Sequence, residues 1–221
     1  MTGVRLVAGM LHSLMTGRAR LHRRELLLPV LIVLLPIGLA LAWHGPLDAT
    51  AFFSESGPVE RLSAGFLLLA FVWLALRRDA SRWHQVVLIL AAALRELDWD
   101  KAFTERGVLS LGLYTGDQPI WQKLFGAAVL VVLVWAVQRL LRRDLRPWLA
   151  GLRRGVGTSW AMLAAVLLYA VAKTLDGLGR KLAPLGVEVS QRLNDTAGRG
   201  EEVLELVGAI LILQIVAIGR R

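Results

Sequence analysis

Apolar segments long enough to cross a membrane recur along this chain, and clusters of arginine separate them. One cluster follows Leu76, another occupies residues 139–154, and Arg220 and Arg221 end the sequence. Crossing about 30 Å of hydrocarbon takes roughly 20 helical residues. The chain is 56% hydrophobic and 19% charged, which excludes disorder and argues against a soluble domain. The sequence therefore predicts an all-α, polytopic membrane protein.

The same length rule predicts six transmembrane helices with both termini on one side. We expect one transmembrane domain over residues 26–218, with helices at about 26–43, 57–76, 83–102, 120–138, 156–176 and 199–218. Residues 1–25 carry five arginines in an amphipathic pattern, which predicts a basic tail on the membrane surface. Ala40-Leu41-Ala42 also resembles a signal-peptide cleavage site, which is the alternative interpretation of residues 26–43.

The distribution of lysine and arginine predicts the orientation. The tail, the 77–82 and 139–154 loops and the C-terminus hold most of the 26 basic residues, whereas the 44–56 loop has none. By the positive-inside rule both termini are cytoplasmic, in a bacterial inner membrane. The net charge of +9 follows from these loop arginines, so no nucleic-acid partner is predicted.

One charged segment lies too deep to be a loop. Arg95-Glu96-Leu97-Asp98-Trp99-Asp100-Lys101 falls inside the predicted 83–102 span, where ionisable residues are costly and indicate a functional site. Charges of other helices fall at the same outer level, which predicts a ligand-binding layer of Glu60, Arg95, Glu96, Asp98, Lys173, Asp176, Glu201, Glu202 and Glu205. The deepest members, Arg95, Glu96 and Glu205, are expected to face the bundle interior and pair with one another.

Helical spacing predicts which of these charges meet. Arg95 and Asp98, Lys173 and Asp176, and Glu201 and Glu205 are each three or four residues apart and share a helix face. A structural alternative also exists, because Glu60, Glu201 and Glu202 in a first helical turn would only oppose the helix dipole.

Three functions are compatible with this layer. It could bind a small polar ligand, a lipid headgroup or a cation, including a metal held by Glu96, Glu202 and Glu205. It could belong to an enzyme acting on lipid at the outer leaflet, with Glu96, Asp98 or Glu205 as base and Arg95 or Lys173 stabilising negative charge. Finally, the charges could pair helices in a subunit of a membrane complex or homo-oligomer.

Cofactor chemistry is limited by the donor residues. The chain has no cysteine, and three of its four histidines lie on the predicted cytoplasmic side, so haem, iron–sulfur and zinc cofactors are disfavoured. Membrane lipids are the predicted partners.

Four short motifs resemble those of an uncharacterised family of bacterial six-helix inner-membrane proteins. They are Glu55-Ser56-Gly57-Pro58-Val59-Glu60, Arg95-Glu96-Leu97-Asp98-Trp99-Asp100-Lys101-Ala102-Phe103-Thr104, Lys173-Thr174-Leu175-Asp176 and Glu201-Glu202-Val203-Leu204-Glu205-Leu206. The resemblance implies the six-helix topology and the membrane location. It implies no activity.

Overall fold

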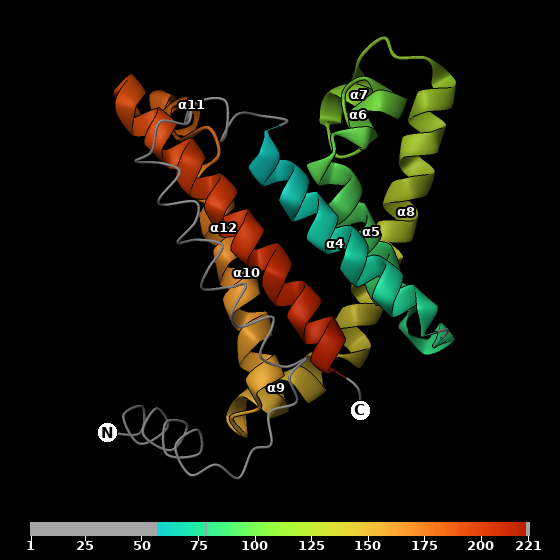
Figure 1. The fold of residues 1–221 in the computed structure, drawn as a ribbon. Helices are drawn as coiled ribbons and strands as arrows, with labels where there is room; N and C mark the ends of the chain where they lie inside the picture. Colours follow the sequence, from blue (N-terminus) through green and yellow to red (C-terminus); the bar gives the residue numbers. More distant parts are fainter. Residues whose placement is uncertain (1–56, 78, 220–221) are drawn as a thin grey trace.

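The computed structural model describes residues 57–77 and 79–219, and within these ranges the chain is helical without strands (Figure 1). The predicted tail at 1–25 and the predicted helix at 26–43 lie outside the described residues. The helices are α4 (Pro58–Leu76), α5 (Trp83–Glu96), α6 (Trp99–Thr104), α7 (Leu111–Thr115), α8 (Ile120–Arg143), α9 (Leu145–Arg153), α10 (Gly157–Leu175), α11 (Leu178–Leu182) and α12 (Gln191–Ile218), with 3-10 turns at Ala80–Arg82 and Ala183–Leu185.

Among the described helices, α4, α8 and α10 are long and apolar enough to cross a membrane. The predicted spans 57–76 and 156–176 match α4 and α10 closely. Pro58 stands in the first turn of α4, where its missing N–H costs nothing. The third span is longer than predicted, because α8 continues through the basic residues to Arg143. These three helices support a membrane protein.

The predicted helix at 83–102 is interrupted after Glu96. Asp98 has a φ of +52°, in the left-handed region that aspartate enters more readily than most residues. A new helix, α6, begins at Trp99. The 14 residues of α5 extend roughly 21 Å at 1.5 Å per residue, short of a full span. The expected common face for Arg95 and Asp98 is therefore wrong, because it required a continuous helix.

The last helix begins earlier than predicted. α12 has 28 residues and starts after Ser190, whose hydroxyl accepts a hydrogen bond from the Leu193 N–H. Ten residues of helix precede Glu201, so neither Glu201 nor Glu202 lies in a first turn. The dipole explanation for these two glutamates is therefore wrong. Glu60 does lie in the first turn of α4, where a carboxylate opposes the dipole.

The predicted basic loop at 139–154 is also mostly helical. α8 ends at Arg143 and α9 begins at Leu145, with Asp144 at the elbow between them. Two residues of α5 contact Asp144 at this junction. Nε2 of buried His84 lies 2.8 Å from Asp144 Oδ2, and Gln85 donates to the same oxygen at 2.9 Å. These two contacts attach the start of α5 to the end of α8.

Helix α4 occupies the centre of the packing. It contacts α12 on one side and α5 on the other, while α10 packs on α12 and α8 packs on α5 (Figure 1). Leu67, Ala93 and Ala209, contributed by α4, α5 and α12, form a fully buried cluster. Small residues such as these two alanines allow close approach between membrane helices. This packing therefore brings the start of α4 and the end of α5 beside the middle of α12.

Different short helices lie at the two ends of the described structure. α9 contacts both α8 and α10 at the end where the described chain stops near Gly219, whereas α11 and the α6–α7 pair stand at the other end (Figure 1). Arginines gather at the α9 end. There Asp79, in the turn between α4 and α5, accepts hydrogen bonds from Ser81 that hold its pKa below the ordinary value.

Candidate functional site

Lys173, in the last turn of α10, is bound by carboxylates of the neighbouring helix. Its Nζ lies 3.0 Å from Glu201 Oε1 and 3.0 Å from Glu205 Oε1, both on α12. Asp176 Oδ2 lies farther away, at 3.9 Å. Glu201 and Glu205 thus share a face one turn apart, and Lys173 pairs with Asp176, as their spacing indicates. The ammonium group joins α10 to α12.

Glu205 is the most buried charged residue of this group, with 7% of its side chain exposed. Its Oε1 lies 3.0 Å from Lys173 Nζ, and Glu205 shares this single ammonium group with Glu201. A carboxylate oxygen in a low-dielectric interior is stabilised only when its hydrogen-bonding capacity is used. Glu205 therefore retains capacity for a further donor.

Three more carboxylates surround Glu205 from three helices. Glu60 of α4, Glu96 of α5 and Glu202 of α12 act electrostatically on one another, and Glu96 and Glu202 also act on Glu205. We define the charge cluster as Glu60, Arg95, Glu96, Lys173, Glu201, Glu202 and Glu205. Four helices build it, and its carboxylates outnumber its cations.

Arg95 corrects one expectation about this cluster. Its side chain is exposed, so Arg95, in the last turn of α5, does not face the bundle interior. The expected mutual pairing of Arg95, Glu96 and Glu205 is replaced by the ion pair of Glu205 with Lys173. Arg95 still acts electrostatically on Glu96 and Lys173, so it lies at the rim of the cluster.

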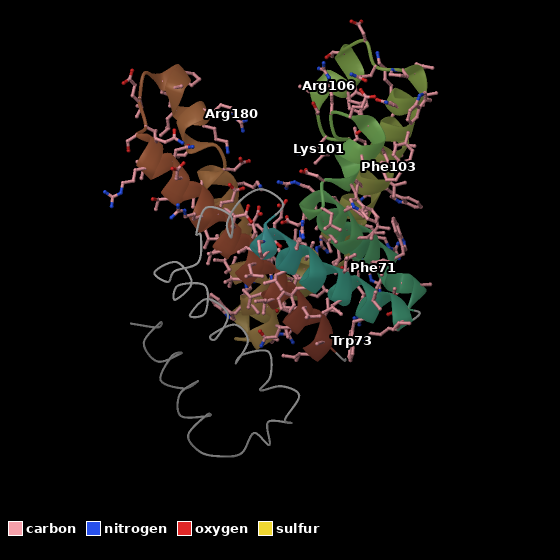
Figure 2. All side chains as sticks on the ribbon, turned by 45° about the horizontal axis from the view of Figure 1, so that its top comes forward. Phe71, Trp73, Lys101, Phe103, Arg106 and Arg180 are labelled. Atoms are coloured by element: carbon pink, nitrogen blue, oxygen red, sulfur yellow. The ribbon has the colours of Figure 1, made fainter. Side chains whose placement is uncertain are left out.

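Two predicted site residues lie outside the cluster. Asp98 is exposed and pairs with Lys101 at 2.6 Å, after the backbone reversal has carried it away from α5. Asp176 lies at the margin, 3.9 Å from both Lys173 and the exposed Arg180. Figure 2 shows Lys101 and Arg180 on separate arms of the structure. Of the predicted general bases, the structure places Glu96 and Glu205 in the cluster and Asp98 apart from it.

Tyr169 joins the cluster although its sequence position did not suggest a role. It lies one turn before Lys173 on α10, and its ring packs against Gly208 of α12. Its hydroxyl is buried with no hydrogen-bond partner among the described residues, and Glu96 and Glu205 both act on it electrostatically. The spacing of four residues from Lys173 is the pattern that could have revealed it.

Metal binding by Glu96, Glu202 and Glu205 is not supported. Within the described ranges, no three or more His, Asp or Glu residues are arranged to hold a metal ion. Although these carboxylates are neighbours, they do not converge on one point.

Two cavities open at the arginine-rich end, away from the charge cluster. One of about 450 Å³ is lined by Trp73, Leu76, Arg77, Asp79, Arg82 and Gly219. The other, of about 210 Å³, is lined by Trp135, Gln138, Arg139, Arg142 and Arg143. Neither is lined by a residue of the charge cluster.

The α7 region packs against the first turns of α8. Tyr114 donates a hydrogen bond to the Val108 carbonyl at 2.7 Å, and desolvation raises the pKa of its hydroxyl above the ordinary value. A side chain at Gly126 of α8 would meet Tyr114 and Leu113, so α7 lies directly against α8.

Comparison with known proteins found no matching family model, no matching curated protein and no matching solved structure.

Proposed function

We propose that this chain is a multi-pass protein of the bacterial inner membrane whose charge cluster, on the periplasmic side, binds the amine of a small polar ligand or lipid headgroup. The observation that carries the proposal is the surplus of carboxylates over cations around buried Glu205. The proposed topology has six transmembrane helices: residues 26–43, the three apolar spans, α12, and the interrupted segment that α5 and α6 form together. Both termini are then cytoplasmic.

The surplus charge is the reason for choosing an amine. An uncompensated buried carboxylate is costly, and a cation placed beside it recovers part of that cost. Lys173 already shows the arrangement, because one ammonium group lies 3.0 Å from the carboxylates of both Glu201 and Glu205. A ligand ammonium, which carries three donors, would repeat this arrangement beside Glu96 and Glu202. The exposed guanidinium of Arg95 at the rim is suited to the phosphate of a zwitterionic ligand.

The orphaned hydroxyl of Tyr169 favours a second candidate at the same site. An enzyme acting on a lipid or lipid-linked substrate at the outer leaflet would use Glu96 or Glu205 as general base and Lys173 or Arg95 to stabilise negative charge. Tyr169 would then supply or accept a proton. A deletion strain with an unchanged lipid composition would contradict this candidate.

Ligand retention tests the first proposal. Wild-type protein in nanodiscs of mixed phosphatidylethanolamine and phosphatidylglycerol should retain the amine lipid preferentially when analysed by native mass spectrometry. Glu96→Gln/Glu202→Gln should reduce this preference by at least about tenfold, because a single lost charge-assisted hydrogen bond, at the lower end of about 1.5–3 kcal/mol, already corresponds to roughly that factor. Soluble phosphoethanolamine, offered separately, distinguishes a free ligand from a lipid.

The matched control removes two carboxylates elsewhere. Glu188 and Asp195 are both exposed and lie outside the charge cluster, so Glu188→Gln/Asp195→Asn should retain the amine lipid as wild type does. Equal retention by wild type and the Glu96→Gln/Glu202→Gln variant, with correct folding of both, would show that the cluster does not bind the amine.

The absence of cysteine makes the topology directly measurable. Single cysteines at Asp117→Cys and Glu188→Cys should react with a membrane-impermeant maleimide in intact spheroplasts. Arg146→Cys should react only after the membrane is permeabilised, and the wild-type chain gives the blank. Labelling of Arg146→Cys in intact spheroplasts would show that the orientation is opposite to the one proposed.

A further inference from the structure

The smaller cavity, at the arginine-rich end of α8, is lined by donors and by no carboxylate. Gln138, Arg139, Arg142 and Arg143 surround about 210 Å³, with Trp135 completing the wall. Arg143 is already engaged, because it donates to the carbonyl oxygen of Ser81 at 2.6 Å and to its hydroxyl at 3.1 Å. Arg142 is exposed at the edge. The cavity therefore has positive charge available for an anion.

Arg139 has a buried donor that the protein leaves unused. Its guanidinium lies 5.9 Å from the centre of the Trp83 ring, and Trp83 packs against Trp135 at 4.7 Å between ring centroids. Its Nε is buried and has no hydrogen-bond partner among the described residues. Buried donors are satisfied in nearly all proteins, so this position calls for an acceptor oxygen. Trp83, which itself packs against Trp135, lies beside the guanidinium and limits its movement.

An apolar stripe runs along α8 into this cavity. Val131, Val134 and Trp135 are 68%, 65% and 59% exposed, and their spacing of three and four residues puts them on one face with Gln138 and Arg142. The face therefore passes from aliphatic residues, through a tryptophan of the kind found at membrane interfaces, to polar and basic side chains. This is the order of groups in a phospholipid, from acyl chain to headgroup.

We propose that this cavity binds the phosphate of an anionic phospholipid, with the acyl chains along the Val131–Val134–Trp135 stripe. Arginine is suited to phosphate because its planar group donates two parallel hydrogen bonds. Basic pockets between membrane helices bind anionic headgroups on the side where arginine is abundant. A site for a whole small molecule usually exceeds about 300 Å³, so this cavity fits a headgroup alone. The continuous stripe favours a lipid over free phosphate.

The larger cavity does not offer the same chemistry. Arg77 donates to the carbonyl oxygens of Gly219 at 3.1 Å and Ala217 at 3.4 Å, which caps the end of α12. Arg82 pairs with Asp79 at 3.1 Å, and Asp79 itself lines the cavity. The guanidinium groups of Arg77 and Arg82 in the larger cavity are therefore already bound by protein oxygens. The proposal is confined to the α8 cavity and is independent of the ligand proposed for the charge cluster.

The experiment measures lipid selectivity of the full chain in nanodiscs containing equal phosphatidylglycerol and phosphatidylcholine. By native mass spectrometry, wild type should retain phosphatidylglycerol over phosphatidylcholine. Arg139→Gln/Arg142→Gln should lower that ratio by at least about tenfold, which is about 1.4 kcal/mol, because both guanidinium groups that would donate to the phosphate are lost. The matched control is Arg146→Gln/Arg153→Gln on α9, where two exposed arginines outside the cavity are lost and the ratio should stay unchanged.

Several results would overturn the proposal. One is equal selectivity of wild type and Arg139→Gln/Arg142→Gln; another is an equal loss in the α9 control, which would indicate diffuse charge attraction. Soluble glycerol phosphate that displaces phosphatidylglycerol at similar concentration would contradict the role of the apolar stripe. If the glutamine variant fails to fold, Arg139→Lys/Arg142→Lys keeps the charge while removing the bidentate geometry, and it should retain part of the selectivity. Wild-type selectivity in the lysine variant would contradict bidentate recognition.

Discussion

Replacing Lys173 with alanine is expected to lower the free energy of unfolding by about 3 kcal/mol, near the lower end of the range for breaking a buried pair. The substitution would leave Glu205, with 7% of its side chain exposed, without its ion-pair partner and would also free Glu201. The lower end applies because 36% of the Lys173 side chain is exposed. Unfolding by denaturant in mild detergent, monitored by tryptophan fluorescence, measures the change.

Two further variants separate this explanation from a general loss of packing. Lys101→Ala breaks the exposed pair with Asp98 and should cost less than about 1 kcal/mol, as surface pairs do. Lys173→Met/Glu205→Leu removes both charges of the pair. It should recover most of the lost stability, because apolar replacements of a buried ion pair are often neutral. A double variant no more stable than Lys173→Ala would contradict the uncompensated-charge explanation.

Placing leucine at Gly208 is expected to destabilise the protein by about 2 kcal/mol through overpacking. A Cβ at this position would lie 2.7 Å from Cε2 of Tyr169 and about as close to two further ring atoms, at 3.1 and 3.2 Å. A ring edge cannot rotate away as the end of a flexible side chain can. The added side chain would therefore push α10 from α12 and separate Tyr169 from Glu205. Denaturant unfolding gives the stability change.

Gly198 on the same helix is the matched control. A Cβ there would meet nothing within 4 Å, so Gly198→Leu should be neutral or stabilise by roughly 0.5 kcal/mol, because leucine favours a helix more than glycine does. Equal effects at the two positions would show that helix propensity, and not contact with Tyr169, governs the change at Gly208.

The sequence predicts the helices whose ends carry strong local features. α4 starts at Pro58, after Gly57, and ends at Leu76, before Arg77, while α10 follows a glycine-containing segment. In both helices the length of the apolar run and the residues that bound it indicate the same ends. The prediction failed at α5 because the length rule assumes that a helix continues until it has crossed the membrane. One residue in the left-handed region, Asp98, ends α5 early, and hydropathy carries no information about that conformation.

The error at α12 has a different cause. Counting about 20 residues of span back from Arg220 predicts a start near residue 199, because the length rule covers only the membrane crossing and not the polar residues 191–200 that extend the helix beyond it. Ser190 was the available indication of the true start, since serine before a helix accepts from the third N–H. A correct start would have shown that Glu201 and Glu202 lie in mid-helix, where opposing the dipole does not explain them.

The predicted depth of each charged residue along its helix is enough to place six of them in one group, because residues at the same height on helices packed side by side lie close together. These six are Glu60, Glu96, Lys173, Glu201, Glu202 and Glu205. Depth could not show the direction in which each side chain points. Arg95 is exposed although it lies beside Glu96 in sequence, because rotation about the α5 axis and the end of that helix decide its environment. Tyr169 was missed because it carries no charge.

The most direct test is a density map of the protein in nanodiscs containing phosphatidylethanolamine, obtained by single-particle electron microscopy. We predict density that is not protein beside Glu96, Glu202 and the Tyr169 hydroxyl, with an amine within hydrogen-bond distance of at least one carboxylate. A map that shows Glu96, Glu202 and Tyr169 bonded only to protein groups, with no further density among them, would contradict the account.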